Sequence, residues 1–183
     1  WLPWKLSGNA TVANLDLRKF GGSDFLGLIG GTLALEIDRE GYRARGALTP
    51  PGLKAGALEV DFDGRYSQGV VTVRKFALRH AASLSRVELS GTVTATEAGP
   101  LLDLDGAWQP LRWPLDDLTP PFTSTRGTFT LQGTGPYDLT AAGDARIGAL
   151  PVVDATLEAQ LQPGRLQLSR IVARTSVNDN VGA

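Results

Sequence analysis

Polar and apolar residues alternate one by one in four segments of the chain, at positions 31–38, 56–63, 127–132 and 153–161. Successive side chains of a β-strand point to opposite faces of a sheet, so each segment predicts a strand that is apolar on one side only. Glycine (22 residues) and proline (11 residues) recur along the whole chain, often in small clusters between the alternating segments. Turns between such short segments favour an antiparallel meander over strand–helix–strand units. The pattern therefore predicts an all-β chain.

The alternation changes phase at two places. Apolar positions are odd-numbered up to Val73 and even-numbered from Phe76, and they are even-numbered up to Leu168 and odd-numbered from Ile171. A change of phase within a strand indicates a β-bulge or a sharp corner. We expect such a bulge or corner at both places.

The two phase changes coincide when residues 31–79 are laid over residues 127–174 with one gap. We interpret these segments as approximate repeats, in which the chain passes from one wall of a sheet to another. The chain starts at Trp1, contains no methionine, and has charge-free runs of at most 11 residues. A membrane-spanning helix needs about 20 apolar residues. We therefore expect residues 1–183 to be one excerpt of an elongated, repeat-like β region without a spanning helix.

Two stretches fit the strand pattern less well. Residues 76–87 have a composition that also suits a short helix, which stays open as an alternative to strands there. Residues 15–30 contain a Gly-Gly-Ser break at 21–23, and this break leaves room for a helical turn at 24–28.

Composition and charge narrow the function classes. Hydrophobic residues make up 42% and charged residues 20% of the chain, which is typical of a globular rather than a disordered protein. The 18 basic and 19 acidic residues give a net charge of -1 without a run of one sign, so no nucleic-acid partner is expected. The absence of cysteine excludes a disulfide scaffold and a cysteine-based zinc site. It also suits an oxidising compartment.

The sequence contains no convincing catalytic, metal-binding or cofactor-binding motif. His80 is the only histidine, which excludes a histidine-rich metal site, and we expect it to be a turn residue after a strand. The Gly-Thr-Gly at 133–135 precedes Pro136 rather than a helix start, which predicts a hairpin turn instead of a dinucleotide loop. The Asp-x-Asp-Gly segments at 61–64 and 103–106 lack the further oxygen ligands of a calcium loop. We expect no enzyme, no metal and no cofactor.

The apolar face of the strands is the main candidate for function. If the strands close into a sandwich, this face is core, whereas an open, curled sheet would expose it as a trough. An exposed apolar patch of more than a few hundred Å² usually marks a binding surface. The alternation leaves both possibilities open. On the trough hypothesis, the groove-lining side chains are Leu33, Leu35, Ile37, Leu58, Val60, Phe62, Val71, Val73, Leu102, Leu104, Phe129, Leu131, Leu157, Leu161, Leu166 and Leu168.

Two tryptophans follow one of these strands. Trp108 and Trp113 lie on either side of Pro110, just after the inward positions Leu102 and Leu104. Aromatic side chains bury large areas, so the pair either caps a core or shapes the wall of a groove. The sequence does not separate these two roles.

The segment that contains these tryptophans resembles a known family. Residues 104–115 are similar to the tryptophan element "G-x-W-x-x-L-x-W-P-L" of TamB-family proteins. Residues 4–10 with 14–16 resemble the family's "W-x-L-x-G-x-A … N-L-D" entry into a repeat, and residues 89–93 resemble its "L-x-G-x-V" strand. Residues 124–133 resemble its following "G-x-x-x-L-x-G" strand. The resemblance extends over most of the chain, and the Trp-Pro element is its most specific part.

The resemblance implies a fold, a place and a function. The family has a curved antiparallel sheet that forms a U-shaped (β-taco) trough with an apolar lining, along which phospholipid passes between the inner and outer membranes of diderm bacteria. It implies a periplasmic part of an inner-membrane-anchored protein, which pairs with the outer-membrane barrel TamA through a part not in this fragment. A role in autotransporter assembly is also ascribed to the system.

Two alternatives to a lipid conduit stay open. An assembly factor for outer-membrane proteins or autotransporters would offer sheet edges to unfolded strands by β-augmentation. A closed sandwich from a surface protein would have a sealed core and no lipid. Unpaired edges of an excised sheet also favour edge-strand self-association.

Overall fold

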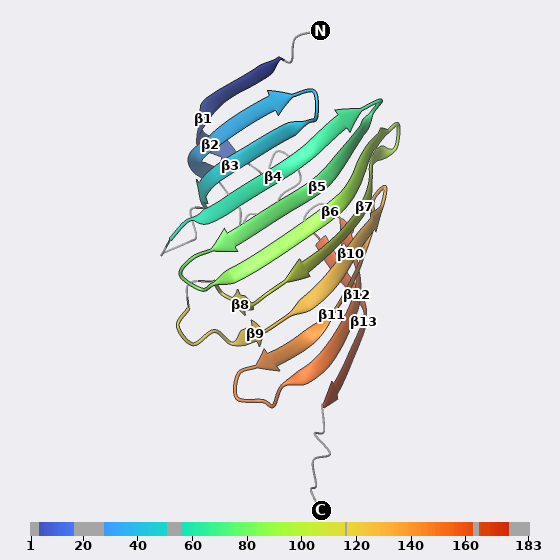
Figure 1. Ribbon diagram of the computed structural model, residues 1–183. Coiled ribbons are helices and arrows are strands. Elements are labelled where there is room, and N and C mark those ends of the chain that lie inside the picture. The colour runs from blue at the N-terminus through green and yellow to red at the C-terminus, as the bar shows by residue number, and fades with distance from the viewer. Residues whose placement is uncertain (1–3, 17–27, 51–55, 116, 163–164, 176–183) are drawn as a thin grey trace, which may run out of the picture.

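The computed structural model describes residues 4–16, 28–50, 56–115, 117–162 and 165–175, and these residues form one large antiparallel sheet of 13 strands (Figure 1). The strands are β1 (Lys5–Asp16), β2 (Leu28–Asp38), β3 (Tyr42–Thr49), β4 (Leu58–Ser67), β5 (Val70–His80), β6 (Ser85–Thr96), β7 (Gly99–Trp108), β8 (Leu111–Trp113), β9 (Phe122–Ser124), β10 (Gly127–Gly133), β11 (Tyr137–Ile147), β12 (Val153–Gln162) and β13 (Arg165–Thr175).

The strands follow one another across the sheet almost in chain order. The main path runs β1-β2-β3-β4-β5-β6-β7-β10-β11-β12-β13, and the short strands β8 and β9 leave it between β7 and β10. There β9 pairs with β8 on one side and with the end of β11 on the other. The sheet is neither closed nor strongly curled. The predicted all-β antiparallel architecture is therefore confirmed.

All four segments with strict alternation are strands, as β2, β4, β10 and β12. The helix alternative at 76–87 is wrong, because β5 runs to His80 and β6 begins at Ser85 after a four-residue turn. The β-hairpin keeps Phe76 opposite Leu89, so both side chains join the apolar side of the sheet. The suggested helical turn at 24–28 lies, up to residue 27, outside the described residues.

Both predicted bulges are present. The register of β5 against β4 and β6 shifts after Val73, and the extra residue is Arg74. The register of β13 against β12 shifts in the same way, and the extra residue is Ser169. Each bulge restores the apolar side chains on its far side to the same face, so Val73 and Phe76 point the same way. The wider repeat of residues 31–79 and 127–174 stays a prediction.

Most packing takes place between neighbouring strands of the one sheet. Among the described residues, no second layer of strands covers either face of the main path. The few buried apolar side chains lie in strands that have a neighbour on both sides: Leu58, Val73, Leu104, Ala145 and Ala159 on one face and Ala77 on the other. The sheet is thus a single layer with two different faces.

Candidate functional site

Strand register builds three adjacent rows across the apolar face. Directly paired residues of neighbouring strands share a face, so each row can be followed from β1 to β13. The middle row is Gly8, Leu35, Ala44, Phe62, Phe76, Leu89, Gly106, Phe129, Ala141, Leu157 and Ile171. The first row, toward β8 and β9, is Ala10, Leu33, Gly46, Val60, Leu78, Val87, Trp108, Gly127, Gly143, Ala155 and Ala173. The third row is Leu6, Ile37, Tyr42, Gly64, Val73, Gly91, Leu104, Leu131, Leu139, Ala159 and Leu168.

These three rows contain no charged side chain on any of the eleven strands of the main path. Their only polar side-chain atoms are the Tyr42 hydroxyl and the Trp108 indole nitrogen. The remaining positions of the rows are Leu, Val, Ile, Ala, Phe and seven glycines, namely Gly8, Gly46, Gly64, Gly91, Gly106, Gly127 and Gly143. The result is an uninterrupted apolar face.

The structure brings the sixteen predicted groove residues to this one face. Eleven of them lie in the three rows, and Leu58 lies in the next row toward β8 and β9. The remaining four, Val71, Leu102, Leu161 and Leu166, lie in the row beyond the third. Residues that the prediction left out, such as Leu89 in β6 and Leu139 in β11, belong to the same rows, and the same alternation of their segments could have found them.

Exposure of the face rises toward the two edges of the sheet. Val73 and Leu104 in the middle are 8% exposed, whereas Leu168 and Ile171 in β13 are 52% and 60% exposed, and Leu6 in β1 is 63% exposed. Side chains in the middle cover one another, but those in the edge strands have a neighbour on one side only. The face therefore presents continuous apolar surface without being a sealed core of the described residues.

Aromatic rings lie flat over glycines in β7, β10 and β11. A Cβ atom at Gly127 would come within 2.0 Å of the Trp108 ring, and one at Gly106 within 2.2 Å of the Phe129 ring. The two rings stack, with centroids 6.3 Å apart and planes 20° from parallel. Because glycine has no side chain, the rings can rest on the backbone instead of standing up from it. Trp108 therefore forms a smooth part of the face.

Asp144 fixes the turn next to Trp108. Its carboxylate accepts hydrogen bonds from the Arg126 amide at 2.8 Å, the Thr125 amide at 2.9 Å and the Thr125 hydroxyl at 2.7 Å. The Ser124 hydroxyl lies 3.3 Å from the carboxylate and accepts the Trp108 indole N–H at 2.6 Å. Burial acts to raise the pKa of Asp144, but these hydrogen bonds together hold the pKa below its ordinary value. Asp144 thus anchors the loop that orients the tryptophan.

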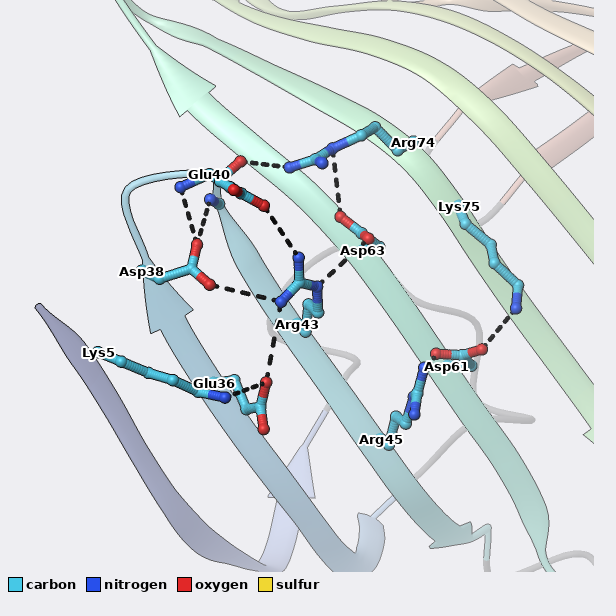
Figure 2. Close-up of polar contacts among 11 residues, drawn as sticks. Lys5, Glu36, Asp38, Glu40, Arg43, Arg45, Asp61, Asp63, Arg74 and Lys75 are labelled. Carbon is cyan, nitrogen blue, oxygen red and sulfur yellow. Dashed lines mark hydrogen bonds and ion pairs between the residues drawn. The ribbon is translucent and has the colours of Figure 1, made fainter. Parts of the chain in front are cut away.

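The opposite face carries a network of ion pairs across β1 to β5 (Figure 2). Arg43 lies at its centre, with guanidinium nitrogens 3.4 Å from the Asp38 carboxylate, 3.9 Å from Glu36, 3.6 Å from Glu40 and 3.5 Å from Asp63. Asp38 raises the pKa of Arg43 by its nearby charge, with smaller contributions from the other carboxylates. The Glu40 amide donates to Asp38 and is the main cause that lowers the pKa of Asp38.

Asp61 forms the second centre of this network. Its carboxylate accepts Lys75 Nζ at 2.6 Å and Arg45 Nε at 3.1 Å (Figure 2), and the hydrogen bond from Lys75 is the main cause that lowers its pKa. The Asp-x-Asp segment at 61–63 therefore belongs to a polar strand face, as its pattern indicates. Among the described residues, no group of three or more metal-binding side chains is present.

The sequence predicts His80 as a turn residue after a strand, but it is the last residue of β5 and lies in a buried polar cluster. Its ring is 1% exposed, and Nδ1 accepts the Ser83 amide at 3.3 Å and lies 2.8 Å from the Ser83 hydroxyl. The Ser83 and Ser85 hydroxyls are 2.9 Å apart, and the Ser85 hydroxyl accepts the Arg112 amide at 3.3 Å. Sequence reasoning found no nucleophile near His80, whereas the hairpin turn folds Ser83 onto it. Ser83 is 4% exposed, so the cluster ties β5, β6 and β8 together without offering a reactive hydroxyl.

Comparison of the chain with known protein families, with curated proteins and with solved structures finds no match. In the part of the chain that the structure describes, no helix is long and apolar enough to span a membrane. The function proposed for the chain therefore stands on the geometry of the apolar face and on the resemblance of its motifs.

Proposed function

We propose that the chain is a segment of a non-enzymatic lipid conduit of the TamB type, which passes the acyl chains of phospholipid along its apolar face. The single observation that carries this proposal is the set of three adjacent rows without a charged side chain from β1 to β13. A closed sandwich also needs an apolar face, but it needs a second sheet to cover it. The described residues supply only one sheet.

The dimensions of the face suit an acyl chain. Ten spacings between eleven strands, at about 4.8 Å each, give a path of about 48 Å. Burial of a methylene group contributes about 0.8 kcal/mol, so a chain of about 16 carbons that buries roughly half its surface gains on the order of 6 kcal/mol before ordering costs. The interaction is strong enough to hold a lipid and is spread evenly over its length.

The chemistry of the rows favours movement over storage. A headgroup needs hydrogen-bond donors or charges, and the rows offer only the Tyr42 hydroxyl and the Trp108 indole, which already donates to Ser124. The phospholipid headgroups would therefore stay in water, beside the apolar face. A lipid that is held only by its chains meets the same surface at each strand and can slide.

In this proposal the sheet is a section of a U-shaped trough. Bulges bend the strand that carries them, and those at Arg74 and Ser169 are the points at which the walls would turn. The described section is open and not strongly curled, so a lipid on it lies in a shallow part of the path. The inner-membrane anchor and the TamA-binding end of such a periplasmic protein would lie outside these 183 residues.

A pair of photo-crosslinking residues tests the proposal. Leu35 lies in the middle row, while its neighbour Glu36 lies on the polar face, 3.1 Å from Lys5. We expect phospholipid adducts in cells from a photoreactive residue at Leu35 and not from one at Glu36. Leu35→Asp and Leu157→Asp should abolish lipid occupancy because each places a charge in the middle row. Absence of adducts at both positions, or equal occupancy in apolar-face and polar-face variants, would refute the conduit.

A second candidate, an assembly factor that acts by β-augmentation, is favoured by one feature of β1. From Leu6 to Ala13 this edge strand has no charged residue and no proline, so it lacks the usual devices that block pairing with another strand. Thr11→Pro would remove a backbone donor from this strand. The assembly hypothesis predicts loss of outer-membrane protein assembly with lipid adducts at Leu35 retained, and the conduit hypothesis predicts both retained.

A further inference from the structure

β5 and β11 end, and β6 and β12 begin, at one end of the sheet (Figure 1). Large exposed apolar residues lie in the turns and short strands at this end. We call this set the rim patch: Leu84, Trp113, Leu118, Ile147, Leu150 and Val152. Their exposed fractions are 70%, 44%, 95%, 58%, 61% and 44%. Single exposed leucines are common on proteins, but a row of large apolar residues on neighbouring turns is not.

Strand pairing holds the centre of the rim patch in place. Trp113 of β8 lies opposite Phe122 of β9, which in turn lies opposite Ile147 of β11. These three side chains therefore form one row on the same side of the β8–β9–β11 sheet. These side chains belong to paired strands. The strand pairing therefore fixes their positions at the surface, which a loose loop would not do.

The turn before β6 adds Leu84 to the patch. Leu84 has a φ of 59°, a left-handed conformation that is unfavourable for leucine, and its side chain points into solvent. Ser85 accepts the Arg112 amide at 3.3 Å, which keeps this turn beside β8. The fold thus holds an apolar side chain outward at a backbone position that glycine would occupy more easily.

Two arginines lie on the other side of β8 and the end of β11. Arg112 and Arg146 both lie opposite Thr123, and both are exposed. Because they directly precede Trp113 and Ile147, their side chains point to the opposite face at the same end of the sheet. Among the described residues, neither has a carboxylate within ion-pair distance. Asp117 in the adjoining loop accepts the Thr119 amide at 2.9 Å, and Asp116 lies outside the described residues. The arginines are therefore available to an anion.

We propose that the rim patch docks the protein on the surface of a phospholipid bilayer. Its apolar side chains project separately from turns and short strands, which suits insertion among lipid headgroups better than packing against a flat protein surface. Tryptophan favours the membrane–water interface, and exposed arginines at the same end of the strands can bind phosphate groups of the bilayer that the strand ends face. This inference does not rest on the lipid conduit, because it needs only the exposed end of the sheet and not the apolar face.

Flotation of the full chain with vesicles tests this proposal. We expect wild-type protein to float with vesicles of phosphatidylcholine and phosphatidylglycerol at 7:3. The double variant Ile147→Asp/Leu150→Asp should bind at least tenfold more weakly, and Arg112→Gln/Arg146→Gln about 25-fold more weakly, or about fivefold for each arginine near an anionic surface. Vesicles of phosphatidylcholine alone should not distinguish the arginine variant from wild type. Tyr66→Asp, 57% exposed at the opposite end of the strands, is the control and should bind within twofold of wild type.

The result can overturn the proposal in two ways. Failure of wild-type protein to float, or equal flotation of wild type and Ile147→Asp/Leu150→Asp, contradicts membrane docking. Dimerisation of the wild type that this variant abolishes, without vesicle binding, assigns the patch to contacts between copies of the chain. Ile147→Ser provides a milder variant if the double variant fails to fold. Lipid adducts at Leu35 report on the conduit separately, so either proposal can fail alone.

Discussion

Replacement of Gly127 by alanine is expected to lift Trp108 off the sheet. The added Cβ would lie 2.0 Å from Cζ2 of the indole, far inside contact distance, and Gly127 does not have a left-handed backbone that would itself disfavour alanine. The ring must rotate or the strands must separate. Either movement breaks the 2.6 Å hydrogen bond from the indole N–H to Ser124 and disturbs the stack with Phe129.

The size of the effect follows from these contacts. Overpacking of a tight site costs about 1–3 kcal/mol, and loss of one hydrogen bond costs about 1 kcal/mol. We therefore expect Gly127→Ala to lower the free energy of unfolding by about 2–4 kcal/mol. For a chain of this size, this corresponds to a decrease in Tm of roughly 6–12 °C.

Thermal unfolding followed by circular dichroism and tryptophan fluorescence measures this change. Gly8→Ala is the matched control, because a Cβ at Gly8 meets nothing within 4 Å and should leave the stability unchanged or slightly higher. Trp108→Ala combined with Gly127→Ala removes the collision, so the double variant should be less destabilised than the sum of the two single variants. Equal stability of Gly127→Ala and Gly8→Ala would show that the ring does not rest on this glycine.

Three further substitutions and one deletion distinguish residues that stabilise the fold from residues that contribute little to its stability. Asp144→Asn should lower the free energy of unfolding by about 2 kcal/mol at neutral pH. The folded pKa of Asp144 is below its unfolded value of about 3.9. The difference between wild type and variant should therefore persist above about pH 3.9 and vanish as the pH falls below the folded pKa, as acid unfolding would measure. His80→Ala should cost about 3 kcal/mol in denaturant unfolding, because it empties a buried site and leaves the Ser83 amide unpaired. Arg43→Gln should lower the free energy of unfolding least of the three substitutions, and less still in 1 M salt, because water and salt screen its partly exposed ion pairs. Deletion of Arg74 should be tolerated with little loss of stability, because it removes the bulge but leaves Val73 and Phe76 two positions apart on the same face.

The apolar face could be predicted from sequence because alternation is a local property. Each strand carries its own period of two, and a phase change such as that between Val73 and Phe76 can be recognised without knowing the neighbouring strand. The order of the strands also follows from the sequence, since short turns favour pairing of consecutive strands. The departure at β8 and β9 does not follow, because these strands are three residues long and carry no period.

Contacts that depend on register could not be predicted. Trp108 and Gly127 are nineteen residues apart in the chain and face one another only because β7 and β10 pair with Trp108 opposite Gly127. Asp144 reaches Thr125 for a similar reason. A shift of one residue in either pairing would send these side chains to the other face. The His80 cluster is closer in sequence, but a histidine followed by serines indicates a turn as readily as a buried network.

The two faces of the sheet place different demands on the rest of the molecule. The charged side chains of the polar face pair with one another, because Arg43, Asp61 and their partners form ion pairs within β1 to β5. The apolar face has no such closure, because its rows end at β1 and β13 with side chains such as Leu6 and Ile171 about 60% exposed. Whatever covers these rows must be apolar, must extend over many strands and must come from outside the described residues. A second protein layer would pack on the rows with fixed side-chain contacts, so Leu35 would contact protein. Lipid chains would cover the same rows without fixed contacts, so Leu35 would contact lipid. Crosslinks from Leu35 to lipid or to protein therefore distinguish a conduit from half of a sandwich.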